Sequence, residues 1–320
     1  MKILIFGAGA IGGYFGGRLH QAGADVTFLV RPARAQHIAT HGLMLESPKD
    51  KATLQVKTVL AGQVNPEYDV IILACKAYDL ASSIAAITPA MGPNDSAHTC
   101  VLPLLNGISH IDTLDAAFGP QRVMGGACQI AATLTPEGVV KALMAFQSIV
   151  WGARHPAQAA LAQALGQSFA NTGVDWRVSG EIMLDMWEKV VFLSTLAGMT
   201  CLMRGSVGDI LAAPGGAECI TRYLDACIAV ATKEGYAPRP PAIERFRATL
   251  STPGSTLTAS MLRDLESGGP IEADHIVGFM LERTRAHGVD EGMLAVAYAH
   301  LKAYGVRRGR NWRIFFRHKQ

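Results

Sequence analysis

The glycines near the start of the chain have the spacing that holds a dinucleotide phosphate. Gly7, Gly9 and Gly12 form the pattern G-x-G-x-x-G directly after an apolar run of strand length. The first glycine of this pattern allows a tight turn, the second lets the backbone approach a pyrophosphate, and the third lets a helix pack closely on the strand. We therefore expect a cofactor-binding loop that consists of Gly7, Ala8, Gly9, Ala10, Ile11 and Gly12. The alternatives are a glycine-rich turn without a ligand and a signal peptide, but spaced glycines are not typical of a signal peptide.

A basic residue stands where such folds select their cofactor. Residues 25–30, which are mostly β-branched or aromatic and apolar after Asp25, predict a second strand, and Arg31 follows it. NAD-binding folds usually place an acid here, about 20 residues after the glycines, whereas an arginine accommodates the 2′-phosphate of NADP. Arg31, with Arg34 one turn later, therefore favours NADP(H). The alternative is a solvated arginine at the start of a helix that Pro32 opens.

Two further polar residues follow predicted strands. Lys76 comes after the apolar run 69–75, and Asn106 closes the run that starts at Cys100. In open parallel sheets ligands bind beyond the carboxyl ends of the strands, so both side chains are expected near the cofactor. The alternative for each is ordinary turn chemistry.

Lys189 is the candidate proton donor of the second half. It stands at the start of a stretch that is uncharged as far as Arg204. A lysine in an apolar cleft has a lowered pKa, which suits a proton donor near neutral pH. The alternative is an exposed Asp185–Lys189 pair one helical turn apart, worth only tenths of a kcal/mol.

The other polar cluster lies between residues 260 and 274. Ser260 and Asp264 are four apart and share one face of a predicted helix. Glu272 and Asp274 follow a Gly-Pro break and open the next helix. Acids in a first helical turn commonly complement the helix dipole, which is the alternative to a role in catalysis.

These residues require an α/β domain followed by a helical one. Apolar strand-like runs alternate with helical patterns up to residue 178, and almost everything after it is predicted to be helix. We expect a Rossmann-type parallel-sheet domain over residues 1–178 and an all-α substrate and catalytic domain over residues 179–320. A segment such as 181–204, apolar on all sides, is expected to be buried.

Composition excludes several classes of protein. The chain has 320 residues, of which 49% are hydrophobic and 17% charged, and its six cysteines include no C-x-x-C pair, so we expect reduced core thiols and no metal site. No uninterrupted apolar segment approaches the ~18 residues of a membrane span, and without an export signal we expect a cytoplasmic protein. The last fourteen residues carry six basic side chains and no acid, but the rest of the chain offers no basic face, so nucleic acid is not expected as a partner. A small molecule is the expected partner, and a homodimer is compatible with the sequence.

Together the motifs resemble the ketopantoate reductases (2-dehydropantoate 2-reductases). The resemblance runs through the chain in order and rests on the glycine loop, Cys75-Lys76-Ala77, Leu105-Asn106-Gly107, Trp187-Glu188-Lys189, and Ser260-Met261-Leu262-Arg263-Asp264 with Glu272-Ala273-Asp274 and Gly278. It implies a Rossmann domain, a helical domain, and reduction of a 2-keto acid by NADPH to make pantoate for pantothenate and coenzyme A.

The resemblance also implies roles for residues of the second half. Lys189 matches the general acid that protonates the ketone oxygen, and Glu272 matches the acid that orients this lysine and the substrate hydroxyl. Ser260 matches the residue that binds the substrate carboxylate, and Asp264 matches the acid near it.

In the first half, Lys76 and Asn106 match residues that flank the nicotinamide and the substrate, and Arg31 matches the contact to the 2′-phosphate. Two positions depart from the family pattern: many members have asparagines four and eight residues after the catalytic lysine, where this chain has Leu193 and Ala197. Arg263 replaces a commonly neutral residue. Because a pocket that bonds a hydroxyl discriminates more strongly than an apolar one, the substrate could be another, more apolar 2-keto acid. A dinucleotide-binding sensor without turnover is the third alternative.

Overall fold

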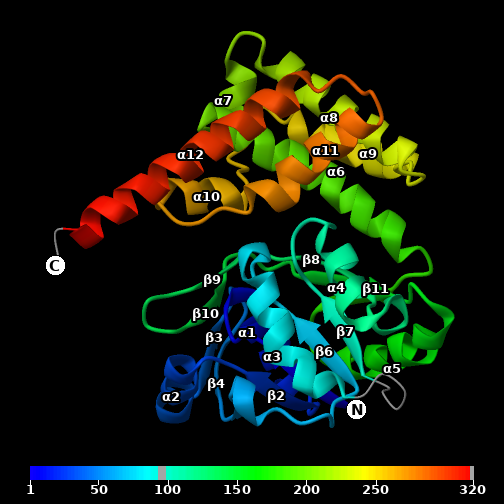
Figure 1. Cartoon of the computed structure of the whole chain (residues 1–320), viewed down its shortest axis with the longest axis vertical. Helices are drawn as coiled ribbons and strands as arrows, with labels where there is room; N and C mark the ends of the chain where they lie inside the picture. The colour runs from blue at the N-terminus through cyan, green and yellow to red at the C-terminus, as the bar shows by residue number, and fades with distance from the viewer. Residues whose placement is uncertain (93–98, 318–320) are drawn as a thin grey trace. The chain divides into compact units, whose positions relative to one another are not determined.

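The computed structural model describes residues 1–92 and 99–317, with side chains described up to residue 310. The chain divides into two compact units. The first comprises residues 1–106 and 110–185, and the second comprises residues 107–109 and 186–320. In Figure 1 the strands of the first unit run from blue to green, and the helices of the second run from green to red.

The first unit is built on a five-stranded parallel sheet. The strand order, from one edge to the other, is β5 (Lys57–Val59), β2 (Asp25–Leu29), β1 (Lys2–Phe6), β6 (Val70–Leu73) and β7 (Cys100–Pro103). The strands β6 and β7 are buried along their whole length, which explains their continuous apolar sequences. The central position of β1, with β2 on one side and β6 on the other, gives the strand order of a Rossmann fold. The predicted α/β fold is confirmed.

Helix α1 (Ala10–Gln21) packs between this sheet and a second one. A Cβ atom at Gly16 would clash with Phe28 and Ile5 of the parallel sheet, and one at Gly17 would clash with Leu45 of the second sheet. Small residues on α1 therefore allow two sheets to approach one helix. The second sheet has the order β4 (Lys51–Leu54), β3 (Leu43–Glu46), β10 (Val140–Ala142) and β9 (Ala132–Leu134).

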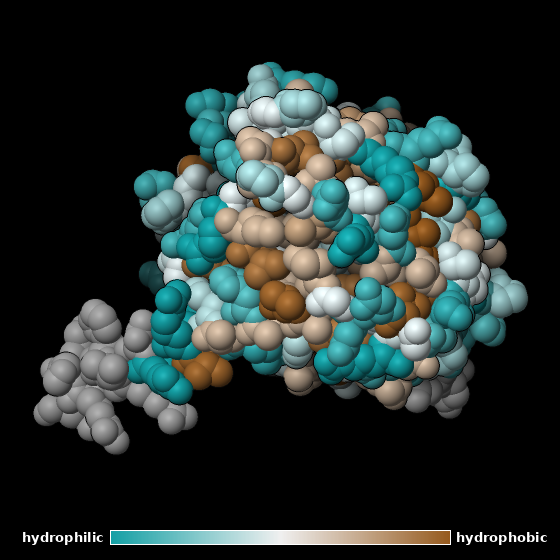
Figure 2. Space-filling model, turned by 90° about the horizontal axis from the view of Figure 1, so that it is seen from above, coloured by the Kyte–Doolittle hydropathy of each residue, from teal (hydrophilic) through white to brown (hydrophobic). Residues whose placement is uncertain are grey.

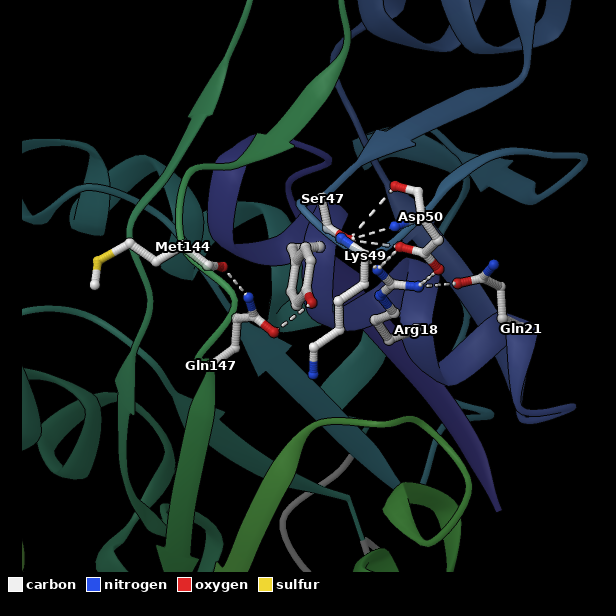
Figure 3. A network of polar contacts seen from close by, with 8 residues as sticks. Arg18, Gln21, Ser47, Lys49, Asp50, Met144 and Gln147 are labelled. Atoms are coloured by element: carbon white, nitrogen blue, oxygen red, sulfur yellow. Dashed lines mark hydrogen bonds and ion pairs between the residues drawn. The ribbon is translucent and has the colours of Figure 1, made fainter.

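Two side chains of α1 also form hydrogen bonds to other segments of the first unit. Arg18 donates two hydrogen bonds of 2.6 Å to the carboxylate of Asp50, in the turn between β3 and β4. Tyr14 donates to Gln147, at a distance of 2.8 Å, in the segment that follows β10 (Figure 3). The Arg18–Asp50 contact fixes the second sheet to the helix that follows the glycine loop, and the Tyr14–Gln147 contact fixes the segment after β10 to the same helix.

The remaining helices of the first unit flank its sheets. They are α2 (Pro32–His41), α3 (Leu80–Met91), α4 (His110–Phe118) and α5 (Ala159–Phe169). A third sheet has the order β12 (Asp175–Val178), β11 (Ser148–Gly152) and β8 (Gly125–Gln129). Trp151 of β11 is fully buried, and its Nε1 donates to the carbonyl of Ala162 in α5, at 2.8 Å.

The second unit is helical in its described residues. Its elements are α6 (Ile182–Met203, which begins in the first unit), α7 (Val207–Ala212), α8 (Gly216–Lys233), α9 (Pro240–Leu250), α10 (Ser260–Glu266), a π-helical turn (Asp274–Gly278), α11 (Phe279–Ala286) and α12 (Gly292–Arg317). Helix α6 is the one helix of the described residues that is long and apolar enough to cross a membrane, but 72% of that window is buried in the protein. This agrees with the predicted buried helix.

One face of the molecule is mixed in hydropathy. Figure 2 shows a face on which hydrophobic residues (brown) lie among hydrophilic ones (teal). Val296 of α12, with 56% of its surface exposed, is one of the exposed aliphatic residues of the second unit. Single side chains of this kind are normal on protein surfaces. All six cysteines are free thiols; four are buried, as expected for core thiols, whereas Cys75 and Cys219 are only partly buried.

Candidate functional site

The glycine loop has the geometry of a phosphate cradle. Gly7 follows β1 with a positive φ of 91°, and its N–H donates to the carbonyl of Leu29, at 3.0 Å. A Cβ atom at Gly12 would overlap the Gly7 carbonyl, whereas a Cβ atom at Gly9 would meet no atom within 4 Å. Gly9 is the N-cap of α1, where no side chain caps the helix and the first turn has no acid. The open N–H groups and the positive end of the helix dipole therefore fit a pyrophosphate.

Arg31 lies at the carboxyl end of β2, next to the glycine loop in the sheet. It is the N-cap of α2, and 82% of its side chain is exposed. Its guanidinium lies 3.4 Å from the carboxylate of Asp79, which is a weak surface ion pair. An exposed guanidinium at this position can reach a phosphate on the adenosine ribose.

Arg34 differs from Arg31 in what it binds. Its Nε donates to the carbonyl of Ala8, at 3.1 Å, and its Nη1 donates to the carbonyl of Gly138, at 2.9 Å. Burial lowers the pKa of Arg34 from its ordinary value. Arg34 therefore binds two backbone carbonyls, one of them in the glycine loop.

Lys76 and Asn106 lie at the carboxyl ends of adjacent strands. Lys76 follows β6 and is the N-cap of a short 3-10 helix, Ala77–Asp79. Asn106 follows β7, which pairs with β6. Because β6 also pairs with β1, the glycine loop, Lys76 and Asn106 lie at one edge of the same sheet. Both residues thus follow strands of the parallel sheet, and their contact with a cofactor stays a prediction.

Lys189 lies in α6 between two buried residues. Glu188 is 7% exposed and Val190 is 1% exposed, while Lys189 itself is half-buried. Asp185 is not the exposed partner that the sequence suggested. It is 8% exposed and accepts hydrogen bonds from Ser179 and Arg177.

Glu188 is a structural residue that the sequence did not single out. Its carboxylate accepts three hydrogen bonds from Arg239, one from the backbone N–H at 2.9 Å and two from the guanidinium at 2.8 Å. This pair fixes the residue before Lys189 to the start of α9. The partner lies 51 residues away in sequence, so no local signal could have found it.

The three other predicted site residues of the second unit, Ser260, Asp264 and Glu272, lie in α10 and in the segment between α10 and the π-helical turn. Ser260 and Asp264 are one turn apart in α10, and both are half-buried. Glu272 is 5% exposed and lies just before the π-helical turn. Asp274 begins that turn and accepts hydrogen bonds from Tyr298, at 2.7 Å, and Lys302, at 2.9 Å, both in α12. Asp274 therefore anchors the turn, and Glu272 is the buried acid.

The predicted residues thus separate by unit. The glycine loop, Arg31, Lys76 and Asn106 all belong to the first unit, and the other four belong to the second: Lys189, Ser260, Asp264 and Glu272. In the part of the chain that the structure describes, no group of three or more His, Cys, Asp or Glu side chains could hold a metal ion. Within the first unit, a depression of about 600 Å³ lies at the amino ends of β1 and β2, opposite to the strand ends that carry the glycine loop, and is lined by Met1, Ala22, Gly23, Ala24, Asp25, Ala164, Gln167, Ser168 and Asn171.

The parallel sheet and its glycine loop define the first unit as a Rossmann-type dinucleotide-binding domain. The chain belongs to the ketopantoate reductase family, a family of oxidoreductases. The family model described as "Ketopantoate reductase PanE/ApbA" matches residues 3–156, and the one described as "Ketopantoate reductase PanE/ApbA C terminal" matches residues 181–305.

Known proteins of similar length match nearly the whole chain. The chain is 35% identical to the "Uncharacterized oxidoreductase YkpB" of Bacillus subtilis, over 96% of this chain and 100% of that protein. It is 26% identical to a 2-dehydropantoate 2-reductase of Mesorhizobium japonicum, over 97% of this chain and 99% of that protein. A solved structure of D-mandelate dehydrogenase with NADH and anilino(oxo)acetate has the same fold, with a TM-score of 0.85, 24% identity, and coverage of 97% of this chain and 100% of that one.

Proposed function

We propose that this protein reduces 2-dehydropantoate (ketopantoate) to pantoate with NADPH. Membership of the ketopantoate reductase family, over both halves of the chain, supports the reaction type. The observation that carries the proposal is Lys189, a half-buried lysine of α6 that is followed by uncharged residues to the end of the helix, at the position of the family's general acid. NADPH is favoured over NADH because Arg31, rather than an acid, follows β2.

In this proposal the cofactor supplies a hydride to C2 of the keto acid, and the chain supplies position, charge and a proton. Lys189 donates the proton to the ketone oxygen, and its positive charge stabilises the developing alkoxide. Glu272 orients Lys189 and the substrate hydroxyl. Ser260 binds the substrate carboxylate, with Asp264 near it.

The residues of the first unit hold the cofactor. The glycine loop binds the pyrophosphate through its N–H groups, and Arg31 binds the 2′-phosphate. Lys76 and Asn106, at the ends of β6 and β7, flank the nicotinamide.

A second candidate is reduction of a different, more apolar 2-keto acid. Leu193 and Ala197 lie four and eight residues after Lys189 on α6, so all three share one helix face. Neither side chain can form a hydrogen bond, which favours an apolar group on the substrate. The fold is shared with D-mandelate dehydrogenase, whose solved structure holds NADH and anilino(oxo)acetate.

The test is NADPH oxidation followed at 340 nm with ketopantoate and with a panel of branched and aromatic 2-keto acids, with NADH as the cofactor control. A higher kcat/KM for ketopantoate than for every other acid supports the first candidate. A higher value for an aromatic or branched acid supports the second. Binding of NADPH without turnover of any acid would replace both with a dinucleotide-binding sensor.

Replacing Lys189 with Ala tests the proposed mechanism. We expect kcat to fall by roughly 10²–10⁴, as for loss of a general acid, while the Kd for NADPH stays unchanged. Lys233→Ala, at the exposed end of α8, is the matched control and should keep full activity. Turnover by Lys189→Ala at the parent rate would refute this role.

A further inference from the structure

Three segments that are distant in sequence meet at the side chain of Arg34. The guanidinium bridges the carbonyl of Ala8, in the glycine loop, and the carbonyl of Gly138, in the turn between β9 and β10. Arg34 itself lies in the first turn of α2, the helix that follows β2. One side chain therefore joins the phosphate-binding loop to α2 and to the second sheet.

His37, one turn further along α2, holds the same turn. Its Nε2 lies 3.0 Å from the carbonyl oxygen of Glu137, and its Nδ1 lies 3.4 Å from Nη1 of Arg34. Because a carbonyl only accepts, Nε2 carries the hydrogen and Nδ1 faces the donor group of Arg34. His37 thus orients the guanidinium as well as the turn.

The turn is shaped to receive these two side chains. Gly138 has a φ of +80°, and its N–H donates to the carbonyl of Thr135, at 2.9 Å. A Cβ atom at Gly138 would overlap the ring of His37 and would lie 2.9 Å from Nη1 of Arg34. Only glycine fits both this backbone conformation and this contact.

We propose that Arg34 is a positioning residue for the pyrophosphate of the cofactor: with His37 and Gly138 it forms a clamp that fixes the Ala8 carbonyl, and so directs the N–H groups of the glycine loop toward the phosphates. Anion binding at a helix N-terminus depends on the direction of these N–H groups. Arg31, which is exposed, binds the 2′-phosphate, which only NADPH has. Arg34 acts on the binding of the pyrophosphate, which NADPH and NADH share.

This inference rests on the proposed nicotinamide cofactor but not on the proposed substrate. The experiment is therefore direct binding: the Kd values for NADPH and NADH, measured by isothermal titration calorimetry without a keto acid. A wrong substrate assignment leaves these values unchanged, so the two proposals can fail separately.

The expected result is a difference between the two arginines. Arg34→Ala should weaken NADPH and NADH by the same factor, roughly tenfold or more, as expected for loss of charge-assisted hydrogen bonds. Arg31→Ala should weaken NADPH alone. Arg34→Lys keeps the charge but offers one nitrogen in place of the separate Nε and Nη1 donors that contact the two carbonyls, so it should resemble Arg34→Ala.

Gly138→Ala disturbs the clamp from its other side and should also weaken both cofactors equally. Its matched control is Gly23→Ala, because Gly23 has a similar φ of +87° but no atom within 4 Å of the added Cβ. This control should lose stability without changing either Kd. Circular dichroism checks that each variant is folded. If Arg34→Ala does not fold, Gly138→Ala and Arg34→Lys provide the test.

Two results would overturn the proposal. A loss of NADPH affinity alone in Arg34→Ala, with Arg34→Lys close to the parent, would make Arg34 a direct ligand of the 2′-phosphate. Unchanged Kd values for both cofactors in the folded variants would show that the clamp has no effect on the loop.

Discussion

At the scale of single residues, Arg31 and Arg34 show that identical side chains three positions apart can have different chemistry. Their sequence context is similar, yet one is exposed and the other bridges two carbonyls. The difference arises from the turn at Gly138, more than 100 residues away. The local pattern predicted a basic site after β2, but only tertiary structure assigns separate roles to the two arginines.

Asp79 is expected to weaken NADPH binding through Arg31. Its carboxylate pairs with the guanidinium at 3.4 Å and repels a nearby phosphate. Because exposed pairs contribute only about 0.2–1 kcal/mol, Asp79→Asn should tighten the Kd for NADPH by roughly two- to fivefold and leave NADH unchanged. The control is Asp25→Asn, which removes a similar surface pair with Lys57 at the amino end of β2. Equal gains for both cofactors in a titration would contradict this account.

Chemistry that depends on short local spacing could be predicted from the sequence. The glycine loop is such a case, because turn, helix start and close packing are all determined within six residues. The Glu188–Arg239 pair is the opposite case. The sequence around each residue does not indicate its partner, and the pair forms only because α6 and the start of α9 are in contact.

At the scale of elements, periodicity located the strands and helices but not their irregular parts. Helix α3, for example, continues to Met91 and includes Pro89 near its end. A proline has no N–H to donate to the preceding turn, so Pro89 removes one backbone hydrogen bond of this helix. The π-helical turn Asp274–Gly278 had no sequence signal, and its first residue, Asp274, accepts a hydrogen bond from Tyr298 of α12. Turns of this kind often occur at functional sites, and this one follows Glu272.

The contact between α6 and α8 depends on one glycine. A Cβ atom at Gly198 would overlap the phenol of Tyr223, which is fully buried. Gly198→Ala should therefore destabilise the protein by about 1–3 kcal/mol through overpacking, although alanine is the better helix former. Gly305→Ala in α12 is the matched control, because no atom lies within 4 Å of the added Cβ, and it should stabilise by up to about 1 kcal/mol. Thermal unfolding of both variants measures the difference, and a parent-like Tm for Gly198→Ala would refute the overpacking.

At the scale of the whole molecule, the change from alternating strands and helices to helices alone is visible in the sequence. It predicted a sheet-containing half with the cofactor residues and a helical half with the catalytic ones. The short segment 107–109 was not predictable, because it belongs to the second unit although both flanking segments belong to the first. A Cβ atom at Gly107 would lie 2.6 Å from the carbonyl oxygen of His275, so the close approach of two backbones decides its place.

The stability of the whole chain in acid should depend on Asp50, which ties the β3–β4 turn to α1 through Arg18 (Figure 3). Hydrogen bonds from Arg18 and Ser47 lower the pKa of Asp50 to about 2. A carboxyl whose folded pKa is depressed stabilises the fold fully above its unfolded pKa of about 3.9, and this contribution is lost as the pH falls toward 2. Since 42% of the Asp50 side chain is exposed, we expect Asp50→Asn to cost only about 1 kcal/mol at pH 7, or roughly 2–4 °C in Tm. Urea unfolding of the parent and the variant between pH 7 and pH 3 should show this difference shrinking to about half. A difference that stays constant over that range would mean that Asp50 acts through packing rather than through its charge.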